Sequence, residues 1–348
     1  LHSGGGSMTP AMAKHFPVRL AASGIAAGAI AAKHIAEQCG YQNAVGLDMG
    51  GTSTDISLIH DGELRVTKQW GVEYGHPIVF PSIEVLTVGA GGGSLAHIDI
   101  AGALRNGPQS AGADPGPACY ERGGTEPTNT DANLALNRLG TVLAGGALEL
   151  NREKATQVIE ERVGQPLSLD TAEAAQAVIK VANANMADAV RLVSIRRGLD
   201  PRDFALIAFG GAGALHGAEV AKELGIPAVI VPPNPGVTSA MWCLLVDIQH
   251  DLSMMYTAAA ESADLEDLER QFRSLEDDAV DRLRHEGVDD ADVVLQRGIS
   301  MRYQGQWRSL QVAMGSGDES LEDAIEMFHQ EHERQFSFRQ NALPVEIY

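Results

Sequence analysis

Near the start of the chain, one short stretch combines two carboxylates, two glycines and three consecutive hydroxyl residues in the order VGLDMGGTSTD. Its chemically useful positions are Asp48, Gly50, Gly51, Thr52, Ser53, Thr54 and Asp55. Glycine lets a backbone approach a phosphate closely, and successive N–H groups in such a turn form an anion-binding concavity. Asp48 and Asp55 are placed to hold Mg²⁺, or another divalent metal, directly or through water. The pattern predicts a turn that binds a polyphosphate and its metal ion; a β-hairpin with a polar turn is the alternative.

A second glycine-rich segment, FGGAGALHG, follows an apolar strand and opens a predicted helix. It does not match the dinucleotide fingerprint, because the spacing is not GxGxxG and no acidic residue ends a second strand about 20 residues later. A glycine turn at a helix N-terminus still provides N–H groups for a nucleotide, and we expect this one to hold the adenosine part. The candidate contacts are Gly210, Gly211, Ala212, Gly213 and His216. His216 is open to two interpretations, a ligand-binding histidine or a helix histidine with protein partners.

Residues 85–130 are unusually rich in glycine and proline, and we expect an ordered loop system without regular structure. Gly91 and Gly92 are predicted to lie against the phosphates or the substrate, and purely structural glycine turns are the alternative. Asp114 is the candidate catalytic residue of this segment, with Cys119 and Tyr120 as further reactive candidates. The cysteine follows a proline rather than an electropositive helix start, so little supports a thiolate nucleophile.

Two pairs of possible metal ligands lie elsewhere in the sequence. His97 and Asp99 are spaced as on one side of a strand, but no third ligand is evident. His329 and His332 lie three residues apart on a predicted helix, where a solvated helix face is the favoured interpretation.

The elements that must position these residues alternate between strands and helices. Predicted strands cover residues 44–48, 55–60, 63–66, 204–209 and 228–231, and predicted helices cover residues 20–38, 131–139, 151–163, 171–197 and 210–224. Such alternation is typical of the α/β class. After residue 247 an acidic helix near 261–286, a strand pair near 291–313 and a helix near 319–336 follow. We therefore expect a nucleotide-binding domain over residues 1–250 and the start of a smaller α+β domain over residues 251–348.

Composition narrows the classes of function. The 348 residues carry a formal net charge of -20, which argues against a nucleic-acid partner because a phosphate backbone demands clustered Lys and Arg. The three cysteines are widely spaced, which indicates a reducing compartment and no disulfide framework. Residues 20–36 are Ala- and Gly-rich but are interrupted by Lys33 and His34, so we expect a buried helix rather than a membrane span. These features, without a signal peptide, predict a cytoplasmic protein.

Seven stretches of the sequence resemble the hydantoinase A/5-oxoprolinase family. They are DMGGTSTDISLI, TVGAGGGSLAHID, GPQSAGADPGPACY, FGGAGALHG, VPPNPGVTSA, RYQGQWRSL and FHQEHERQFSF. The resemblance implies the ribonuclease-H-like half of an actin/Hsp70/sugar-kinase-type ATPase fold. It also implies ATP and Mg²⁺ as cofactors and activation of a cyclic amide or carbonyl substrate by phosphorylation. Ring-opening hydrolysis or carboxylation would follow, with a hydantoinase B-type partner subunit in an oligomer.

The chain also departs from the family pattern. Members usually carry an earlier Asp-x-Gly-Gly-Thr segment, which would supply the opposite phosphate-binding lobe and is absent from this sequence. A proline usual after Ser23-Gly24 is replaced by Ile25. We therefore expect one piece of a longer or split subunit. The alternatives are a non-catalytic nucleotide-binding or scaffold subunit, and a metal-dependent hydrolase that needs no ATP.

Overall fold

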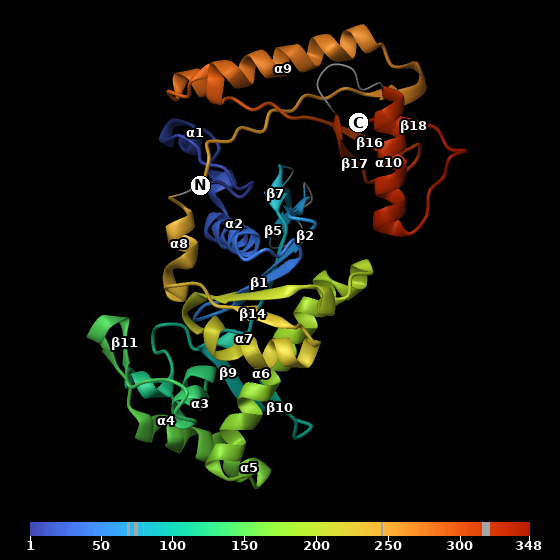
Figure 1. Cartoon of the computed structure of the whole chain (residues 1–348). Helices are drawn as coiled ribbons and strands as arrows, with labels where there is room; N and C mark the ends of the chain where they lie inside the picture. Colours follow the sequence, from blue (N-terminus) through green and yellow to red (C-terminus); the bar gives the residue numbers. More distant parts are fainter. Residues whose placement is uncertain (68–69, 73–75, 79, 245, 315–320) are drawn as a thin grey trace. The chain divides into compact units, whose positions relative to one another are not determined.

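The computed structural model describes residues 1–67, 70–72, 76–78, 80–244, 246–314 and 321–348. The chain separates into two compact units, Leu1–Asp247 and Ile248–Tyr348. Figure 1 shows the helices and strands of both units along the chain.

A mixed sheet forms the centre of the first unit. Its strands run in the order β14-β13-β1-β2-β3, and β8 also pairs with β2. The bounds are β1 Ala44–Met49, β2 Thr54–His60, β3 Glu63–Leu64, β8 Val85–Val88, β13 Ala205–Phe209 and β14 Ala228–Ile230. The first three strands are antiparallel neighbours, whereas β13 runs parallel to β1 and β14 parallel to β13. This is the strand order of a ribonuclease-H-like fold and confirms the predicted α/β class.

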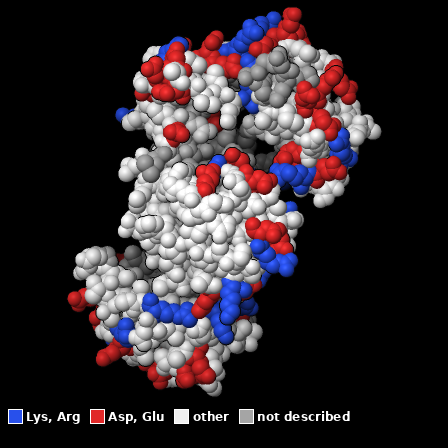
Figure 2. Space-filling view, in the orientation of Figure 1, with Lys and Arg blue, Asp and Glu red and all other residues white. Residues whose placement is uncertain are grey.

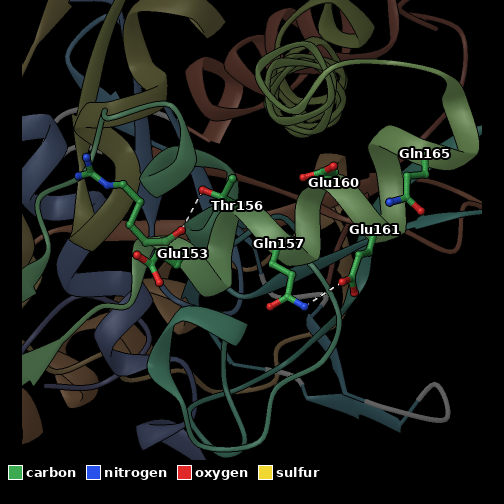
Figure 3. A pocket seen from close by; sticks show the side chains of 7 residues that line it. Glu153, Thr156, Gln157, Glu160, Glu161 and Gln165 are labelled. Carbon is green, nitrogen blue, oxygen red and sulfur yellow. Dashed lines mark hydrogen bonds between the residues drawn. The ribbon is translucent and has the colours of Figure 1, made fainter.

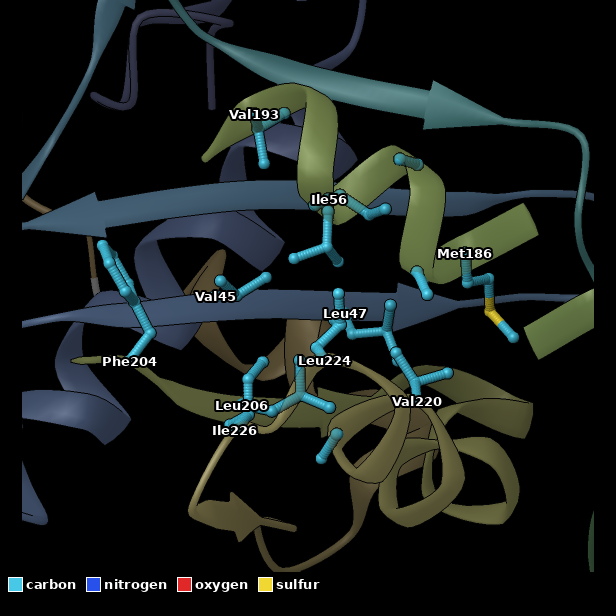
Figure 4. Packing of buried hydrophobic residues seen from close by; sticks show 14 of the residues in the cluster. Val45, Leu47, Ile56, Met186, Val193, Phe204, Leu206, Val220, Leu224 and Ile226 are labelled. Carbon is cyan, nitrogen blue, oxygen red and sulfur yellow. The ribbon is translucent and has the colours of Figure 1, made fainter. Parts of the chain in front are cut away.

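Helices cover both faces of this sheet (Figure 1). On one face lies α2 (Ser23–Gln38), whose Ala31, Ala32 and Ile35 pack against the sheet. On the other face lie α6 (Thr171–Val193) and α7 (Gly210–Leu224). Figure 4 shows the core on that face, where side chains of β1, β2 and β13 meet those of α6 and α7. The packing of this core therefore fixes the register of the strands on which the site residues lie.

The glycine- and proline-rich segment is more regular than predicted. It contains a hairpin of β9 (Ser94–Ile98) and β10 (Leu104–Ser110), and it ends in α3 (Asn129–Ala135). The expectation of a loop system without regular structure was therefore wrong. Small residues such as Ala96 let the hairpin pack closely on α3 and α6, so glycine content here reflects close packing rather than irregular backbone.

The remaining elements of the first unit are short or follow the predicted helices. The helix predicted over 151–163 is α4 (Arg152–Ile159) continued by a π-helical turn, Glu160–Gly164, and α5 (Gln165–Leu167). The helix predicted over 171–197 ends at Val193, and a 3₁₀ turn follows at Ile195–Arg197. Others are α1 Pro10–His15, α8 Thr238–Trp242, β4 Val66–Thr67, β5 Trp70–Val72, β6 His76–Ile78, β7 Ser82–Ile83, β11 Val142–Leu143 and β12 Leu148–Glu149.

The second unit is a four-stranded antiparallel sheet with two helices. Its strands run in the order β15-β18-β16-β17. The bounds are β15 Ala258–Ala259, β16 Arg297–Tyr303, β17 Leu310–Met314, β18 Val345–Ile347, α9 Leu265–His285 and α10 Leu321–Phe336. The order of helix, strand pair and helix follows the sequence-based expectation. Among the described residues, no helix is both long enough and apolar enough to cross a membrane.

Acidic and basic side chains are interspersed on the molecular face shown in Figure 2. On α9 several of them form ion pairs, such as Arg270 with Asp267 at 2.7 Å and Arg284 with Asp281 at 3.0 Å. Exposed pairs of this kind contribute little to stability. The acidity of this region is therefore a solvated surface.

Candidate functional site

The predicted phosphate-binding stretch forms a hairpin turn between β1 and β2. We call Gly50–Ser53 the glycine turn. Gly50 N–H donates to Ser53 O at 2.9 Å, which closes the turn, and Gly51 and Thr52 lie exposed at its tip. In the part of the chain that the structure describes, the N–H groups of Gly51, Thr52 and Ser53 have no protein partner. Such successive free donors at an exposed turn form an anion-binding concavity.

There is open space above this turn. A Cβ atom built on Gly51 would meet no protein atom within 4 Å, and one on Gly50 would meet only Ser53 O at 3.8 Å. Neither glycine has a positive φ, so neither backbone conformation requires glycine. The fold itself therefore does not demand these two glycines. A turn whose amides must contact a bulky anion does demand them.

Two carboxylates face each other beside the glycine turn. Asp48 and Asp55 are directly paired across β1 and β2, which places both side chains on the same face of the sheet. Asp48 Oδ2 accepts a hydrogen bond from Ser239 at 2.7 Å, and Asp55 Oδ1 accepts one from Thr87 at 2.5 Å. Like charges directly opposite each other destabilise a strand pair unless a cation lies between them.

The electrostatics of this pair favour a bound cation. Burial raises the pKa of Asp48, against the smaller lowering effect of the Ser239 hydroxyl. Burial also raises the pKa of Asp55, the Thr87 hydroxyl lowers it, and the charge of Asp48 raises it further. Mg²⁺ suits such a pair, because it is commonly held by one or two carboxylates together with substrate phosphates. The donor set present thus fits a magnesium–polyphosphate ligand.

The second glycine motif lies at the same edge of the sheet. Because β1 and β13 are parallel and pair Asp48 with Phe209, the chain after β13 emerges beside Asp48. Gly210 has φ +83°, and a Cβ there would lie 2.4 Å from Asp48 Oδ1. Gly211 opens onto free space, and no side chain caps the N-terminus of α7. The helix therefore presents free N–H groups next to the carboxylate pair.

Gly91 and Gly92 lie behind the glycine turn rather than above it. We call Gly91–Gly93 the glycine brace. A Cβ on Gly91 would lie 2.4–2.6 Å from the backbone of Thr52 and Ser53. The N–H groups of Gly92 and Gly93 donate to the carbonyls of the turn, at 3.0 and 2.6 Å. All three glycines are buried and support the turn, and the contact of Gly91 and Gly92 with phosphates stays a prediction.

Thr54 and His216 also face protein. The Thr54 side chain is fully buried and donates to the Ala90 carbonyl, on the side opposite the carboxylates. His216 is 0% exposed, and its ring nitrogens contact Asn183 and Asn133 at 2.7 and 3.1 Å. Burial lowers the pKa of His216 to about 4, so the ring is neutral. These partners favour the interpretation of His216 as a helix histidine, and its contact with a nucleotide stays a prediction.

The reactive candidates of the hairpin region are not brought into the site. Asp114 is exposed, and the described residues show no contact between it and Asp48 or Asp55, so its catalytic role stays a prediction. Cys119 is fully buried, and burial together with the charge of Asp131 raises its thiol pKa far above the ordinary value. A thiolate nucleophile at this position is therefore disfavoured.

The predicted metal-ligand pairs form no cluster. Asp99 binds Arg105 at 2.7 Å and caps two amides of the hairpin. His329 and His332 are buried, where a solvated face was expected, and His329 lies 2.7 Å from the Tyr303 hydroxyl. No group of three or more possible ligands among His, Cys, Asp and Glu occurs within the described ranges.

A broad hollow of 640 Å³ lies elsewhere on the first unit. It is lined by Arg152, Glu153, Thr156, Gln157, Glu160, Glu161 and Gln165. Figure 3 shows these side chains along α4 and its π-helical continuation. None of them belongs to the glycine turn or to α7. This hollow is therefore separate from the candidate site.

Sequence reasoning missed the two hydroxyl partners of the carboxylates, Ser239 and Thr87. Ser239 lies 191 positions from Asp48 along the chain, and no local spacing connects the two. Its signal is the motif VPPNPGVTSA, whose hydroxyl residues follow a strand that ends at the same sheet edge.

Comparison with known proteins identifies the relatives of this site. The family model for hydantoinase/oxoprolinase matches residues 1–252, and the model for the hydantoinase/oxoprolinase C-terminal domain matches residues 256–342. The chain belongs to the hydantoinase/oxoprolinase family. This confirms the family predicted from the motifs.

Individual family members extend the comparison. The caprolactamase subunit alpha of Pseudomonas jessenii is 38% identical over 99% of this chain and 50% of its own length. The acetophenone carboxylase gamma subunit of Aromatoleum aromaticum is 36% identical over 88% of this chain and 42% of its own. The crystal structure of the ATP-dependent caprolactamase from Pseudomonas jessenii aligns with a TM-score of 0.84 and 37% identity, over 99% of this chain and 51% of that one. The chain therefore spans about half the length of these relatives, two of which are named as subunits.

Proposed function

We propose that the first unit binds ATP with Mg²⁺ at the glycine turn. The N–H groups of Gly51, Thr52 and Ser53 would hold the phosphates, and Asp48 and Asp55 would hold the metal ion. One observation carries this proposal: the free amides and the open space lie directly beside two carboxylates that oppose each other across β1 and β2. The free N–H groups at the start of α7 would receive the adenosine part.

Such a site serves phosphoryl transfer. Bound ATP would supply the γ-phosphoryl group that converts an amide or carbonyl oxygen of the substrate into a better leaving group. The protein contributes positioning and charge neutralisation, which are the main sources of catalysis in this chemistry. The names of the relatives, caprolactamase and acetophenone carboxylase, support a cyclic amide or carbonyl substrate, followed by ring-opening hydrolysis or carboxylation.

We infer further that the chain works within a larger assembly. Two relatives are named as subunits, and this chain corresponds to about half of each. A hydantoinase B-type subunit would complete the reaction, and Asp114 would act at the substrate side. The alternative of an ATP-independent metal hydrolase has less support, because a hydrolytic metal site commonly uses three protein ligands and the described residues offer no such group.

Calorimetry tests the proposal. The chain is titrated with a non-hydrolysable ATP analogue, with and without Mg²⁺, and compared with Asp48→Ala and with Asp114→Ala as a matched control carboxylate. We expect binding that depends on Mg²⁺, a loss of at least about tenfold in Asp48→Ala and none in Asp114→Ala. Absence of binding by the unmodified chain, or equal binding by Asp48→Ala, would contradict the proposal.

A further inference from the structure

Beneath the glycine brace, five polar residues from three helices are connected by a series of hydrogen bonds, in which the main-chain carbonyl of Asn129 accepts one of the bonds. We call them the polar chain; they are Asn129 and Asn133 of α3, Asn183 of α6, and His216 and Glu219 of α7. The first four are between 0% and 4% exposed. Buried polar groups that are connected in this way rigidify a core and specify a single arrangement.

The outer half of the polar chain begins at the surface. Arg138 binds one oxygen of Glu219 at 2.8 Å, and the Asn183 amide donates to the other oxygen at 2.6 Å. Because the carboxylate only accepts, this bond fixes the orientation of the Asn183 amide. Its oxygen therefore faces His216 Nδ1 at 2.7 Å, and this nitrogen must donate.

The inner half reaches the glycine brace. The Asn133 amide nitrogen lies 3.1 Å from His216 Nε2 and donates to the Asn129 carbonyl at 3.0 Å. Since the carbonyl only accepts, the amide group of Asn133 is fixed and Nε2 of the histidine must accept. The Asn129 side chain then donates to the Gly91 carbonyl at 2.8 Å. His216 is thereby locked as a neutral ring with its proton on Nδ1.

The other end of the Asn133 amide group lies outside the series of hydrogen bonds. Asn133 Oδ1 is buried and has no partner among the described residues. A buried acceptor without a partner is costly, and it persists here because the amide nitrogen of Asn133 is needed by both His216 and Asn129.

We propose that His216 is a positioning residue, which holds the glycine brace, and through it the glycine turn, in register with the N-terminus of α7. The polar chain is the physical connection between the two motifs that receive the two ends of the nucleotide. Gly91 contacts the backbone of Thr52 and Ser53, so a shift of the brace moves the amides of the turn. The consequence for ligand binding rests on the proposed nucleotide site, whereas the effect on the brace does not.

The test compares three variants of the full chain. His216→Leu keeps the volume of the side chain but removes both hydrogen bonds. His216→Gln retains one donor and one acceptor, and is the conservative rescue. Val163→Ala truncates a fully buried side chain of the same unit that belongs to a different cluster, and is the control for general destabilisation.

Two quantities are measured at a temperature where all variants are folded: hydrogen exchange of the Gly92 and Gly93 amides, and the affinity for a non-hydrolysable ATP analogue with Mg²⁺. We expect His216→Leu to speed the exchange and weaken the binding, each by about tenfold or more. His216→Gln returns both values toward those of the unmodified chain, and Val163→Ala changes neither. Unchanged exchange in His216→Leu, an equal increase in Val163→Ala, or no rescue by His216→Gln would overturn the inference.

A measurement on the unmodified chain covers the case in which His216→Leu fails to fold. The ¹⁵N shifts of the His216 ring at pH 7 should show a neutral ring protonated on Nδ1. A protonated ring, or a proton on Nε2, would overturn the inference. If the unmodified chain binds no nucleotide, the proposed function fails, and the amide exchange still decides whether the polar chain holds the brace.

Discussion

The glycine turn and the glycine brace look alike in the sequence, yet the fold uses them in opposite ways. Gly50 and Gly51 lie at an exposed tip with open space above them. Gly91 is pressed against the backbone of the same turn, where a Cβ would lie 2.4 Å from Thr52 C. One pair of glycines leaves room for a ligand, and the other allows two backbone segments to touch. Only the surroundings of each glycine distinguish a binding role from a packing role.

The largest effect is expected at the brace. Gly91→Ala would force Cβ into the backbone of the turn, and overpacking typically costs about 1–3 kcal/mol. Because the contacted atoms are backbone, we expect a cost near the upper end of that range. We expect a corresponding fall in the free energy of unfolding, measured by urea denaturation, together with loss of nucleotide binding. A Gly91→Ala variant as stable as the unmodified chain would show that the brace does not pack as described.

The histidine behind the brace should make stability depend on pH. Its folded pKa is lowered to about 4 from the ordinary 6.5, so the unfolded chain binds the proton more tightly. Stability from this group is complete above pH 6.5 and is lost as pH falls toward 4, at up to about 1.4 kcal/mol per pH unit. Across this window, the free energy of unfolding from urea denaturation should depend more steeply on pH in the unmodified chain than in His216→Gln. An equal dependence of the free energy of unfolding on pH in both chains would contradict a buried neutral histidine.

The carboxylate pair should make stability depend on pH in the opposite direction. The pKa values of Asp48 and Asp55 are raised, so without a metal ion the free energy of unfolding falls as pH rises through these values. Asp48→Asn removes one of the opposed charges, and we expect it to stabilise the metal-free chain by about 0.2–1 kcal/mol. Mg²⁺ should stabilise the unmodified chain more than the variant in thermal unfolding. An equal response to Mg²⁺ would place the ion elsewhere.

The smallest effect on stability is expected at the turn itself. Gly51→Ala adds a Cβ in open space at a residue without positive φ, so its effect on the free energy of unfolding should stay within about 1 kcal/mol and is expected to be stabilising. Affinity for the ATP analogue should nevertheless fall. A Gly51→Ala variant that loses stability but binds the analogue normally would show that this glycine serves packing rather than binding.

Much of the fold could be predicted because local patterns are strong. The apolar strands beside the glycine motifs and the long amphipathic helices occur close to the predicted positions. The hairpin of β9 and β10 could not be predicted, because the many glycines and prolines obscure the alternation of small buried residues such as Ser94 and Ala96. For the site, the motifs indicated Asp48, Asp55 and the turn. They could not separate Thr54, which faces the core, from Thr52, which is exposed, since that depends on strand register.

Amide NMR can show whether the free amides of the glycine turn bind the phosphates. The ¹H–¹⁵N signals of Gly51, Thr52 and Ser53 are followed while a non-hydrolysable ATP analogue and Mg²⁺ are added to the chain. We expect these three signals to shift most and their hydrogen exchange to slow, while the already bonded amides of Gly92 and Gly93 change little. Binding that leaves the signals of the three turn amides unshifted would contradict phosphate binding by the glycine turn.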